Sequence, residues 1–213
     1  MFKKIKVKIC GLTREADVDL ALSLGADFCG FITYEASPRG ISLDRAAELA
    51  QRVPIGKRVF VDVGVEVEKL REAKRLGFDS FQVHAGLGTS MAVLAGWSGV
   101  VGAEHLWLAP RIGPADTFPV IALEFCNTFL IDTYSKSKAG GTGETGDWER
   151  FAEFKSRYLT ASFLLAGGLN AENVLEAIAV SGTEVVDVSS GVEISPGVKD
   201  ATKLKELFER LNS

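Results

Sequence analysis

Three segments of the chain carry, at or near the end of an apolar, β-rich run, a side chain suited to acid–base chemistry. Cys10 follows the run 5–9, Asp132 follows the run 128–131, and Asp187 lies within the run 185–188. A thiol can act as a base once it has lost its proton, and a carboxyl group can act as an acid while it keeps one. Such side chains at several strand ends are typical of one architecture, which the remaining elements must test.

Short runs of β-branched and aromatic residues alternate with longer amphipathic segments. Strands are expected at 5–9, 28–32, 58–62, 79–83, 105–109, 128–131, 162–166 and 185–188. Helices are expected at 14–24, 43–53, 67–76, 89–97, 170–180 and 201–211. Gly25 is expected to end the first of these helices and Asn170 to cap the helix at 170–180.

Strict alternation of strand and helix predicts a parallel sheet with right-handed crossovers. Eight such units predict an α/β protein, a single (β/α)8 TIM barrel domain over residues 1–213, with its active site on the loops that follow the strands. Alternation alone does not distinguish this barrel from an open doubly wound sheet. No Gly-x-Gly-x-x-Gly follows the first strand, which weakens a dinucleotide-binding version of that alternative.

Composition excludes several classes of function. A net charge of −4 without a Lys/Arg-rich cluster argues against a nucleic-acid partner. No apolar run is long enough for a membrane span, and Lys3, Lys4, Lys6 and Lys8 interrupt any signal peptide. The odd number of three cysteines favours a reduced, cytoplasmic protein over a disulfide framework. No His/Asp/Glu cluster indicates a metal.

Cys10 is the candidate base, although a cysteine in a strand is usually structural, as we expect for Cys29 and Cys126. Side chains alternate along a strand, so Lys8 shares the side of Cys10. If that side faces the barrel, Lys8 is a buried cation, and Asp187 on the neighbouring eighth strand is its expected partner. A cation beside Cys10 would also favour the thiolate.

Asp132 is the candidate acid, since strand interiors disfavour aspartate; the alternative is a simple cap of a turn. A partly apolar barrel mouth would keep its carboxyl group protonated. Arg39, in the loop after the second strand, is suited to hold a carboxylate in a bidentate way, or is only a solvated loop residue. His84 ends the fourth strand and is expected to pack or hydrogen-bond near the ligand.

Two polar, glycine-containing loops follow the seventh and eighth strands, and phosphate sites of barrels frequently lie there. Turn chemistry explains either loop alone but explains the two together less well, so we expect a phosphorylated small-molecule substrate. The expected phosphate-binding residues are Gly167, Gly168, Ser189, Ser190 and Gly191.

An ordered set of segments, spread from end to end of the chain, resembles the phosphoribosylanthranilate isomerase family of tryptophan biosynthesis. The segments are Val7-Lys8-Ile9-Cys10-Gly11-Leu12-Thr13, Ser37-Pro38-Arg39, Gln82-Val83-His84, Asp132-Thr133, Gly140-Gly141-Thr142-Gly143, Asp147-Trp148, Leu165-Ala166-Gly167-Gly168-Leu169, Asp187-Val188-Ser189-Ser190-Gly191-Val192-Glu193 and Ser195-Pro196-Gly197-Val198-Lys199-Asp200. The resemblance implies a cofactor-free Amadori rearrangement of N-(5′-phosphoribosyl)anthranilate to 1-(2-carboxyphenylamino)-1-deoxyribulose 5-phosphate, in a monomer or homodimer.

Carried over by position, the resemblance implies that Cys10 is the base, Asp132 the acid and Arg39 the carboxylate ligand. It places Asp187 near the reacting amine and the phosphate on the two glycine loops. The loop Ala85-Gly86-Leu87-Gly88 departs from the family pattern, as does the third strand, Val59-Phe60-Val61-Asp62.

Two other functions compete with the isomerase. Related phosphate-binding barrels such as indole-glycerol-phosphate synthase rely on a lysine and glutamates at strand ends, which Cys10 with Asp132 does not match. The second is a binding protein that kept the barrel and the phosphate site without catalysis, and intact Cys10, Asp132 and Arg39 argue against it. The Gly/Ser/Lys-rich segment 135–145 suggests a lid over the site.

Overall fold

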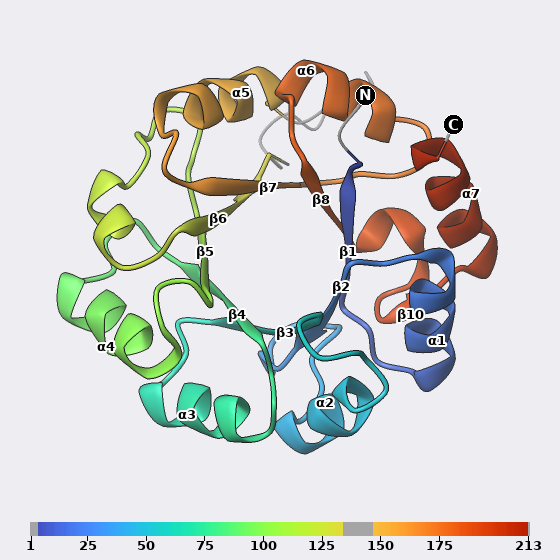
Figure 1. The fold of residues 1–213 in the computed structure, drawn as a ribbon, viewed down its shortest axis with the longest axis horizontal. Helices are drawn as coiled ribbons and strands as arrows, with labels where there is room; N and C mark the ends of the chain where they lie inside the picture. Colours follow the sequence, from blue (N-terminus) through green and yellow to red (C-terminus); the bar gives the residue numbers. More distant parts are fainter. Residues whose placement is uncertain (1–3, 134–146, 213) are drawn as a thin grey trace.

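The structure, a computed structural model, describes residues 4–133 and 147–212. Eight parallel strands pair in sequence order and close into a barrel, with helices forming a ring around it (Figure 1). The barrel strands are β1 (Lys6–Cys10), β2 (Phe28–Ile32), β3 (Arg58–Val63), β4 (Ser80–Ala85), β5 (Leu106–Pro110), β6 (Thr128–Asp132), β7 (Ser162–Ala166) and β8 (Val185–Val188). The predicted TIM barrel is confirmed, and the open sheet is excluded because β1 pairs with both β2 and β8.

Helices follow most strands. They are α1 (Glu15–Leu24), α2 (Leu43–Ala50), α3 (Val67–Arg75), α4 (Met91–Val101), α5 (Trp148–Arg157), α6 (Val174–Ser181) and α7 (Ala201–Leu211). All of them except α5, which was not predicted, lie at about the predicted places. Gly25 ends α1 in the left-handed conformation (φ 103°), and its N–H donates to the carbonyls of Ala21 and Leu22. Glycine has no Cβ to oppose this conformation, so the helix stop predicted from the sequence is confirmed.

Three features differ from the predicted strand–helix repeat. The fifth unit carries only a short 3-10 helix, η1 (Val120–Glu124), because Pro114 and Pro119 lack the N–H groups that a longer helix would need. α6 begins after a turn in which the Asn170 side chain accepts the N–H of Glu172, so Asn170 precedes the helix rather than capping it. After β8 the chain forms η3 (Ser190–Val192) and a small hairpin of β9 (Glu193–Ser195) and β10 (Val198–Lys199).

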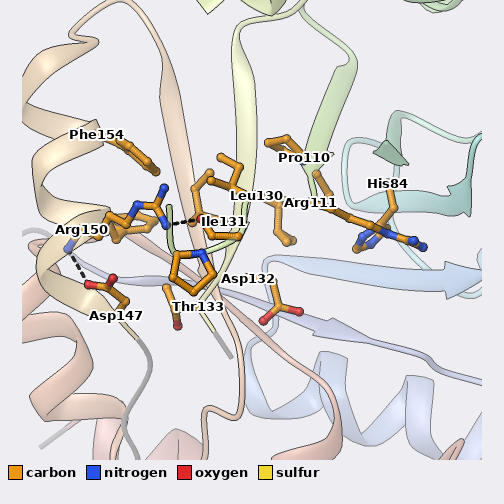
Figure 2. A pocket seen from close by; sticks show the side chains of 15 residues that line it. His84, Pro110, Arg111, Leu130, Ile131, Asp132, Thr133, Asp147, Arg150 and Phe154 are labelled. Carbon is orange, nitrogen blue, oxygen red and sulfur yellow. Dashed lines mark hydrogen bonds between the residues drawn. The ribbon is translucent and has the colours of Figure 1, made fainter. Parts of the chain in front are cut away.

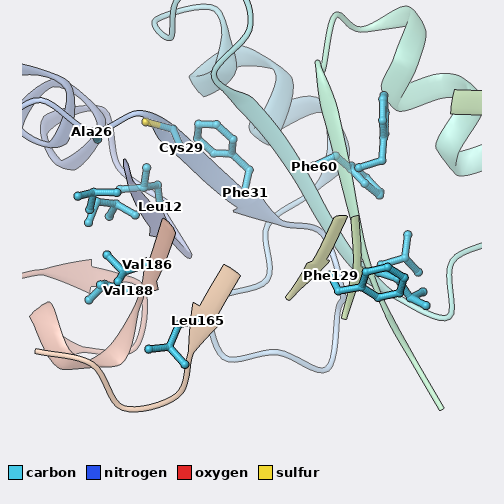
Figure 3. Packing of buried hydrophobic residues seen from close by; sticks show 14 of the residues in the cluster. Leu12, Ala26, Cys29, Phe31, Phe60, Phe129, Leu165, Val186 and Val188 are labelled. Atoms are coloured by element: carbon cyan, nitrogen blue, oxygen red, sulfur yellow. The ribbon is translucent and has the colours of Figure 1, made fainter. Parts of the chain in front are cut away.

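The core has an outer and an inner layer, because alternate side chains of each strand point away from and into the barrel. The outer layer packs strands against helices and includes Phe31, Phe60 and Phe129 (Figure 3). The inner cluster fills the barrel and consists of Cys10, Val59, Val61, Trp107, Ala109, Leu130, Leu164 and Ala166. Each large apolar side chain buried in these layers contributes about 1.5–3 kcal/mol. Cys10 therefore shares the barrel interior with apolar residues.

Candidate active site

The predicted site residues gather at the carboxyl ends of the strands. Cys10 ends β1, Asp132 ends β6, and His84 and Asp187 lie one residue before the ends of β4 and β8. Arg39 is in the loop after β2, and the predicted phosphate-binding residues follow β7 and β8. Consecutive parallel strands of a closed barrel direct these ends to one face, so the topology brings all the loops that carry predicted residues together there.

Lys8 and Asp187 form a buried ion pair beneath this face. Lys8 Nζ lies 2.8 Å from Asp187 Oδ1, and the two side chains are 0% and 8% exposed. The pairing that strand alternation and barrel closure predicted is therefore confirmed. Since an isolated buried charge is costly, each group keeps the other in place.

The Cys10 thiol is buried two residues along β1 from Lys8. Burial raises its pKa above the ordinary value of 9.0, whereas Lys8 and Lys199 lower the pKa only in part and Asp187 raises it further. The expectation that a neighbouring cation favours the thiolate is confirmed in direction, because Lys8 lowers the pKa of Cys10, but burial is the larger effect. Burial outweighs the cations, and Cys10 of the free protein is a thiol at neutral pH.

Gly30 is a residue of the site for which the sequence analysis predicted no role. A Cβ atom placed on Gly30 would lie 3.0 Å from Cys10 Sγ and 3.1 Å from Lys8 Nζ. The glycine thus leaves room on β2 for the thiol and the ammonium group of β1. A glycine inside the otherwise apolar strand Phe28–Ile32 was the available signal, since such a glycine often marks a close approach of neighbouring groups.

Arg39 binds an internal carboxylate. Its Nε and Nη2 atoms donate to Glu193 at 2.9 Å and 2.7 Å, and Lys199 Nζ lies 2.8 Å from the same carboxylate. The side chains of Glu193 and Lys199 are 4% and 0% exposed. Among the described residues we find no hydrogen-bond acceptor for the N–H groups on Nη1 of Arg39.

Lys199 also connects this network to the candidate base. Its ammonium group donates to the backbone carbonyls of Cys10 at 2.6 Å and Ser189 at 3.2 Å. The Ser189 hydroxyl donates to the Cys10 carbonyl as well, at 3.1 Å. The ends of β1 and β8 are thereby tied to the Arg39–Glu193 pair. The sequence analysis named Glu193 and Lys199 only within family segments and predicted no role for them.

The two glycine loops lie against each other. A Cβ atom on Gly191 would lie only 2.0 Å from the carbonyl oxygen of Leu169, so no larger residue fits there without a shift of the backbone. Gly167 and Gly168 adopt positive φ angles of 108° and 65°. Asn173 Nδ2 donates to the Gly168 carbonyl at 3.1 Å and holds this turn in place. The residues predicted to bind phosphate after β7 and after β8 are therefore neighbours in space.

Asp132 lines a cavity of about 440 Å³ (Figure 2). Apolar residues of its wall include Leu130, Ile131 and Phe154, yet the Asp132 side chain is exposed. The apolar part of the wall agrees with the partly apolar mouth that we expected around the acid, although the side chain itself is not buried. The direction of β6 places Asp132 at the mouth of the barrel. The burial of its side chain depends on the positions of neighbouring loops, which the sequence does not reveal.

Two arginines missed by the sequence analysis also line this cavity. Arg150 in α5 donates from Nη1 to the Gly113 carbonyl at 2.7 Å, and Asp147 accepts the backbone N–H of Arg150 at 3.0 Å (Figure 2). Arg150 thus braces the loop after β5. Arg111 at the start of this loop lies beside His84 in Figure 2 and lowers its pKa. Two cationic side chains, one after β5 and one on α5, therefore line the cavity.

His84 lies in the same cavity and is neutral. Burial, together with the nearby cations Lys8 and Arg111, lowers its pKa from 6.5 to about 4. Its Nε2 atom is 2.9 Å from Gln82 Nε2 on the same face of β4.

Within residues 4–133 and 147–212, no three His, Cys, Asp or Glu side chains converge as metal ligands, and no helix is long and apolar enough to cross a membrane. The segment 135–145, for which we hypothesised a lid role, lies outside the described residues. A closed barrel with a thiol, carboxyl groups and buried ion pairs at the carboxyl ends of its strands is the architecture of a (β/α)8-barrel enzyme.

Comparison with known proteins identifies the family. Residues 7–210 match the family described as N-(5′-phosphoribosyl)anthranilate (PRA) isomerase. The N-(5′-phosphoribosyl)anthranilate isomerase of Citrifermentans bemidjiense is 36% identical over 206 residues and covers 95% of each chain. That of Pelobacter propionicus is 37% identical over 209 residues, covering 96% of this chain and 94% of its own.

Solved structures agree with the sequence comparisons. Monomers generated from the dimeric Thermotoga maritima isomerase superpose with a TM-score of 0.79 at 30% identity, over 98% of this chain and 99% of theirs. A phosphoribosyl anthranilate isomerase in complex with reduced 1-(o-carboxyphenylamino)-1-deoxyribulose 5-phosphate superposes with a TM-score of 0.77 at 29% identity, over 98% of both chains. The chain belongs to the phosphoribosylanthranilate isomerase family.

Proposed function

We propose that this barrel isomerises N-(5′-phosphoribosyl)anthranilate to 1-(2-carboxyphenylamino)-1-deoxyribulose 5-phosphate in tryptophan biosynthesis, with Asp132 as general acid and Cys10 as general base. The observation that carries the assignment of roles is the position of the two groups at one face of the barrel. Cys10 ends β1 beside the Lys8–Asp187 ion pair, and Asp132 ends β6 in the cavity. A base and an acid from separate strands can therefore act on one substrate held between them.

In the first step Asp132 donates a proton to the ribose ring oxygen. The bond from this oxygen to C1′ breaks as the nitrogen lone pair forms a C=N bond, which leaves a cationic iminium. Asp187, held by Lys8, supplies a negative charge near that nitrogen. Charge stabilisation of this kind is effective because the carboxylate is already fixed in place before the reaction starts.

In the second step Cys10 removes the proton from C2′, and the electron pair of that C–H bond moves toward the iminium nitrogen. The product is an enolamine, which becomes the ketone by tautomerisation. Burial keeps the free Cys10 a thiol, so the reaction requires its deprotonation. Lys8 and Lys199 favour the thiolate, and the iminium adds a further positive charge beside it.

The two anionic ends of the substrate set its orientation. The glycine loops formed by Gly167, Gly168, Ser189, Ser190 and Gly191 hold the phosphate, since glycine lets backbone N–H groups approach an oxyanion closely. Arg39 holds the anthranilate carboxylate through Nη1 while Nε and Nη2 stay on Glu193. Fixing both ends places C2′ between base and acid, and such positioning contributes several kcal/mol.

The test is the loss of anthranilate-type fluorescence when freshly made substrate meets the wild type, Cys10→Ala, Asp132→Asn and the matched control Cys126→Ala. Cys126 is a buried free cysteine outside the mouth, so its replacement should leave kcat nearly unchanged. Removing a general acid or base typically lowers the rate about 10²–10⁴-fold. Rapid turnover by all four proteins would reject both roles, and no turnover by the wild type would reject the function.

The cellular compartment and the oligomeric state are two further parts of the proposal. The three free, buried cysteines support a reducing, cytoplasmic environment. We propose a monomer or a homodimer, and sedimentation equilibrium over a range of concentrations distinguishes the two.

A further inference from the structure

Gln82, which is buried, and His84, which is partly buried, form a pair of polar side chains inside the barrel. They lie two residues apart on β4, so both point to the same side of the strand. Gln82 is 1% exposed, and its Nε2 atom is 2.9 Å from His84 Nε2. His84 lines the cavity that also contains Asp132, whereas Gln82 is not part of the cavity wall. Gln82 therefore acts on the site through His84.

The chemistry of the amide determines where the imidazole carries its proton. An amide NH2 group donates hydrogen bonds and does not accept them, so His84 Nε2 must be the acceptor. The proton of the neutral ring then lies on Nδ1. Among the described residues the structure shows no hydrogen-bond partner for Nδ1. This nitrogen is not one of the fully buried atoms without a partner.

The orientation of the amide decides which tautomer follows. The structure directs Gln82 Nε2 toward His84 and leaves Gln82 Oε1 buried without a hydrogen-bond partner among the described residues. Rotating the amide by 180° would turn the oxygen toward His84 and require the ring proton on Nε2. The tautomer of His84 is therefore the observable that distinguishes the two orientations.

The surrounding charges keep the ring neutral. Lys8 of β1 and Arg111 after β5 lower the pKa of His84 and outweigh Asp187 of β8 and Asp62 of β3, which raise it. Burial is the largest cause of its lowered pKa of about 4. A neutral imidazole that accepts at one nitrogen must donate at the other, so His84 presents an N–H donor rather than a base.

We propose that Gln82 is a positioning residue that holds His84 with its proton on Nδ1, so that this N–H donates a hydrogen bond to an oxygen atom of the substrate in the cavity. The substrate half of this inference rests on the proposed isomerase function. The tautomer half concerns the free protein and is tested without turnover. It gives His84 a definite role, that of a donor, in place of general contact with the ligand.

Nitrogen-15 NMR of the histidine rings tests the tautomer directly. The chain has two histidines, and the second, His105, has a half-exposed side chain, so the variant His105→Gln assigns the spectrum and serves as a control for activity. At neutral pH we expect a protonated Nδ1 and an unprotonated, acceptor-type Nε2 for His84. A proton on Nε2, or on both nitrogens, overturns the inference. This result is read from the wild-type protein, so it does not depend on whether a Gln82 variant folds.

The variant Gln82→Glu tests the consequence, because a carboxylate accepts hydrogen bonds and reverses the pairing. We expect the proton to move to Nε2 and kcat/KM to fall about tenfold, the factor that one hydrogen bond supplies. If the ring instead becomes cationic at neutral pH, Nδ1 keeps its proton and kcat/KM should stay near the wild-type value; a tenfold loss in that case would refute the donor role. If the proton moves and kcat/KM stays at the wild-type value, the donor role is refuted. If the wild type shows the expected tautomer but no isomerase activity, the proposed function fails while the tautomer assignment stands.

Discussion

Replacing Glu193 with Gln should destabilise the protein far more than a typical carboxylate-to-amide change. Glu193 bridges Arg39 and Lys199, and the Lys199 side chain is fully buried. Removing one member of a buried ion pair typically costs about 3–5 kcal/mol, because the other charge loses its compensation. Since the amide oxygen still accepts one hydrogen bond, we expect the lower end, about 3 kcal/mol. For a chain of this length that corresponds to a decrease in Tm of about 6–12 °C.

The assay is thermal or denaturant unfolding of three variants beside the wild type. Glu193→Gln with Lys199→Met removes the uncompensated ammonium group, so the double variant should be more stable than Glu193→Gln alone. Glu48→Gln is the matched control, because Glu48 forms an ion pair with Arg45 in which the side chains are 64% and 38% exposed. Its loss should cost at most about 0.5 kcal/mol.

The pH dependence of the unfolding free energy tests whether the uncompensated charge of Lys199 causes the loss of stability. Burial already lowers the pKa of Lys199 below 10.5, and loss of Glu193, which raises that pKa, lowers it further in the variant. Between this lowered folded-state value and 10.5 the unfolded chain binds more protons, so the stability of Glu193→Gln rises with pH. Its deficit relative to the wild type should therefore shrink as the pH approaches 10.5. A constant deficit, or an equal loss in Glu48→Gln, would refute the reasoning.

Three further outcomes follow from the site. Because the pKa of His84 is lowered to about 4, acidification from pH 6.5 to about 4 should lower the unfolding free energy of the wild type by up to about 3 kcal/mol. Denaturant titrations over a pH series should show no such loss in His84→Gln. Gly191→Ala should raise KM, since its Cβ would lie 2.0 Å from a backbone oxygen of the loop after β7, whereas Gly99→Ala in α4 meets open space and should raise Tm slightly. Because the pKa of Cys10 is raised above 9.0, kcat/KM should still increase with pH at pH 9 in a stopped-flow profile.

Each of these has a contrary result. Equal acid sensitivity of the wild type and His84→Gln would mean that the imidazole titrates normally. An unchanged KM in Gly191→Ala would move the phosphate away from the loop after β8. A pH profile that is level well below 9 would show that the base is already ionised in the free enzyme.

Local rules predicted much of the fold and part of the site. Side-chain alternation along β1, together with closure against β8, was enough to predict the ion pair between Lys8 and Asp187. Helix-stop chemistry predicted Gly25 at the end of α1. Both predictions depend on periodicity and on backbone conformation, which a short stretch of sequence specifies by itself. Prolines after β5 were equally visible but were given too little weight, so a 3-10 helix was missed.

The sequence by itself determined the order of strands and helices, the family, and the types of the groups at the strand ends. The tertiary structure alone decided what surrounds each group. It joined Arg39 to Glu193, 154 residues away, and added Lys199. It buried Cys10 deeply enough to raise its pKa, and it left Asp132 exposed. Burial and ion pairing are sums over neighbours that are distant in the chain, so a protonation state is a property of the packed barrel rather than of a motif.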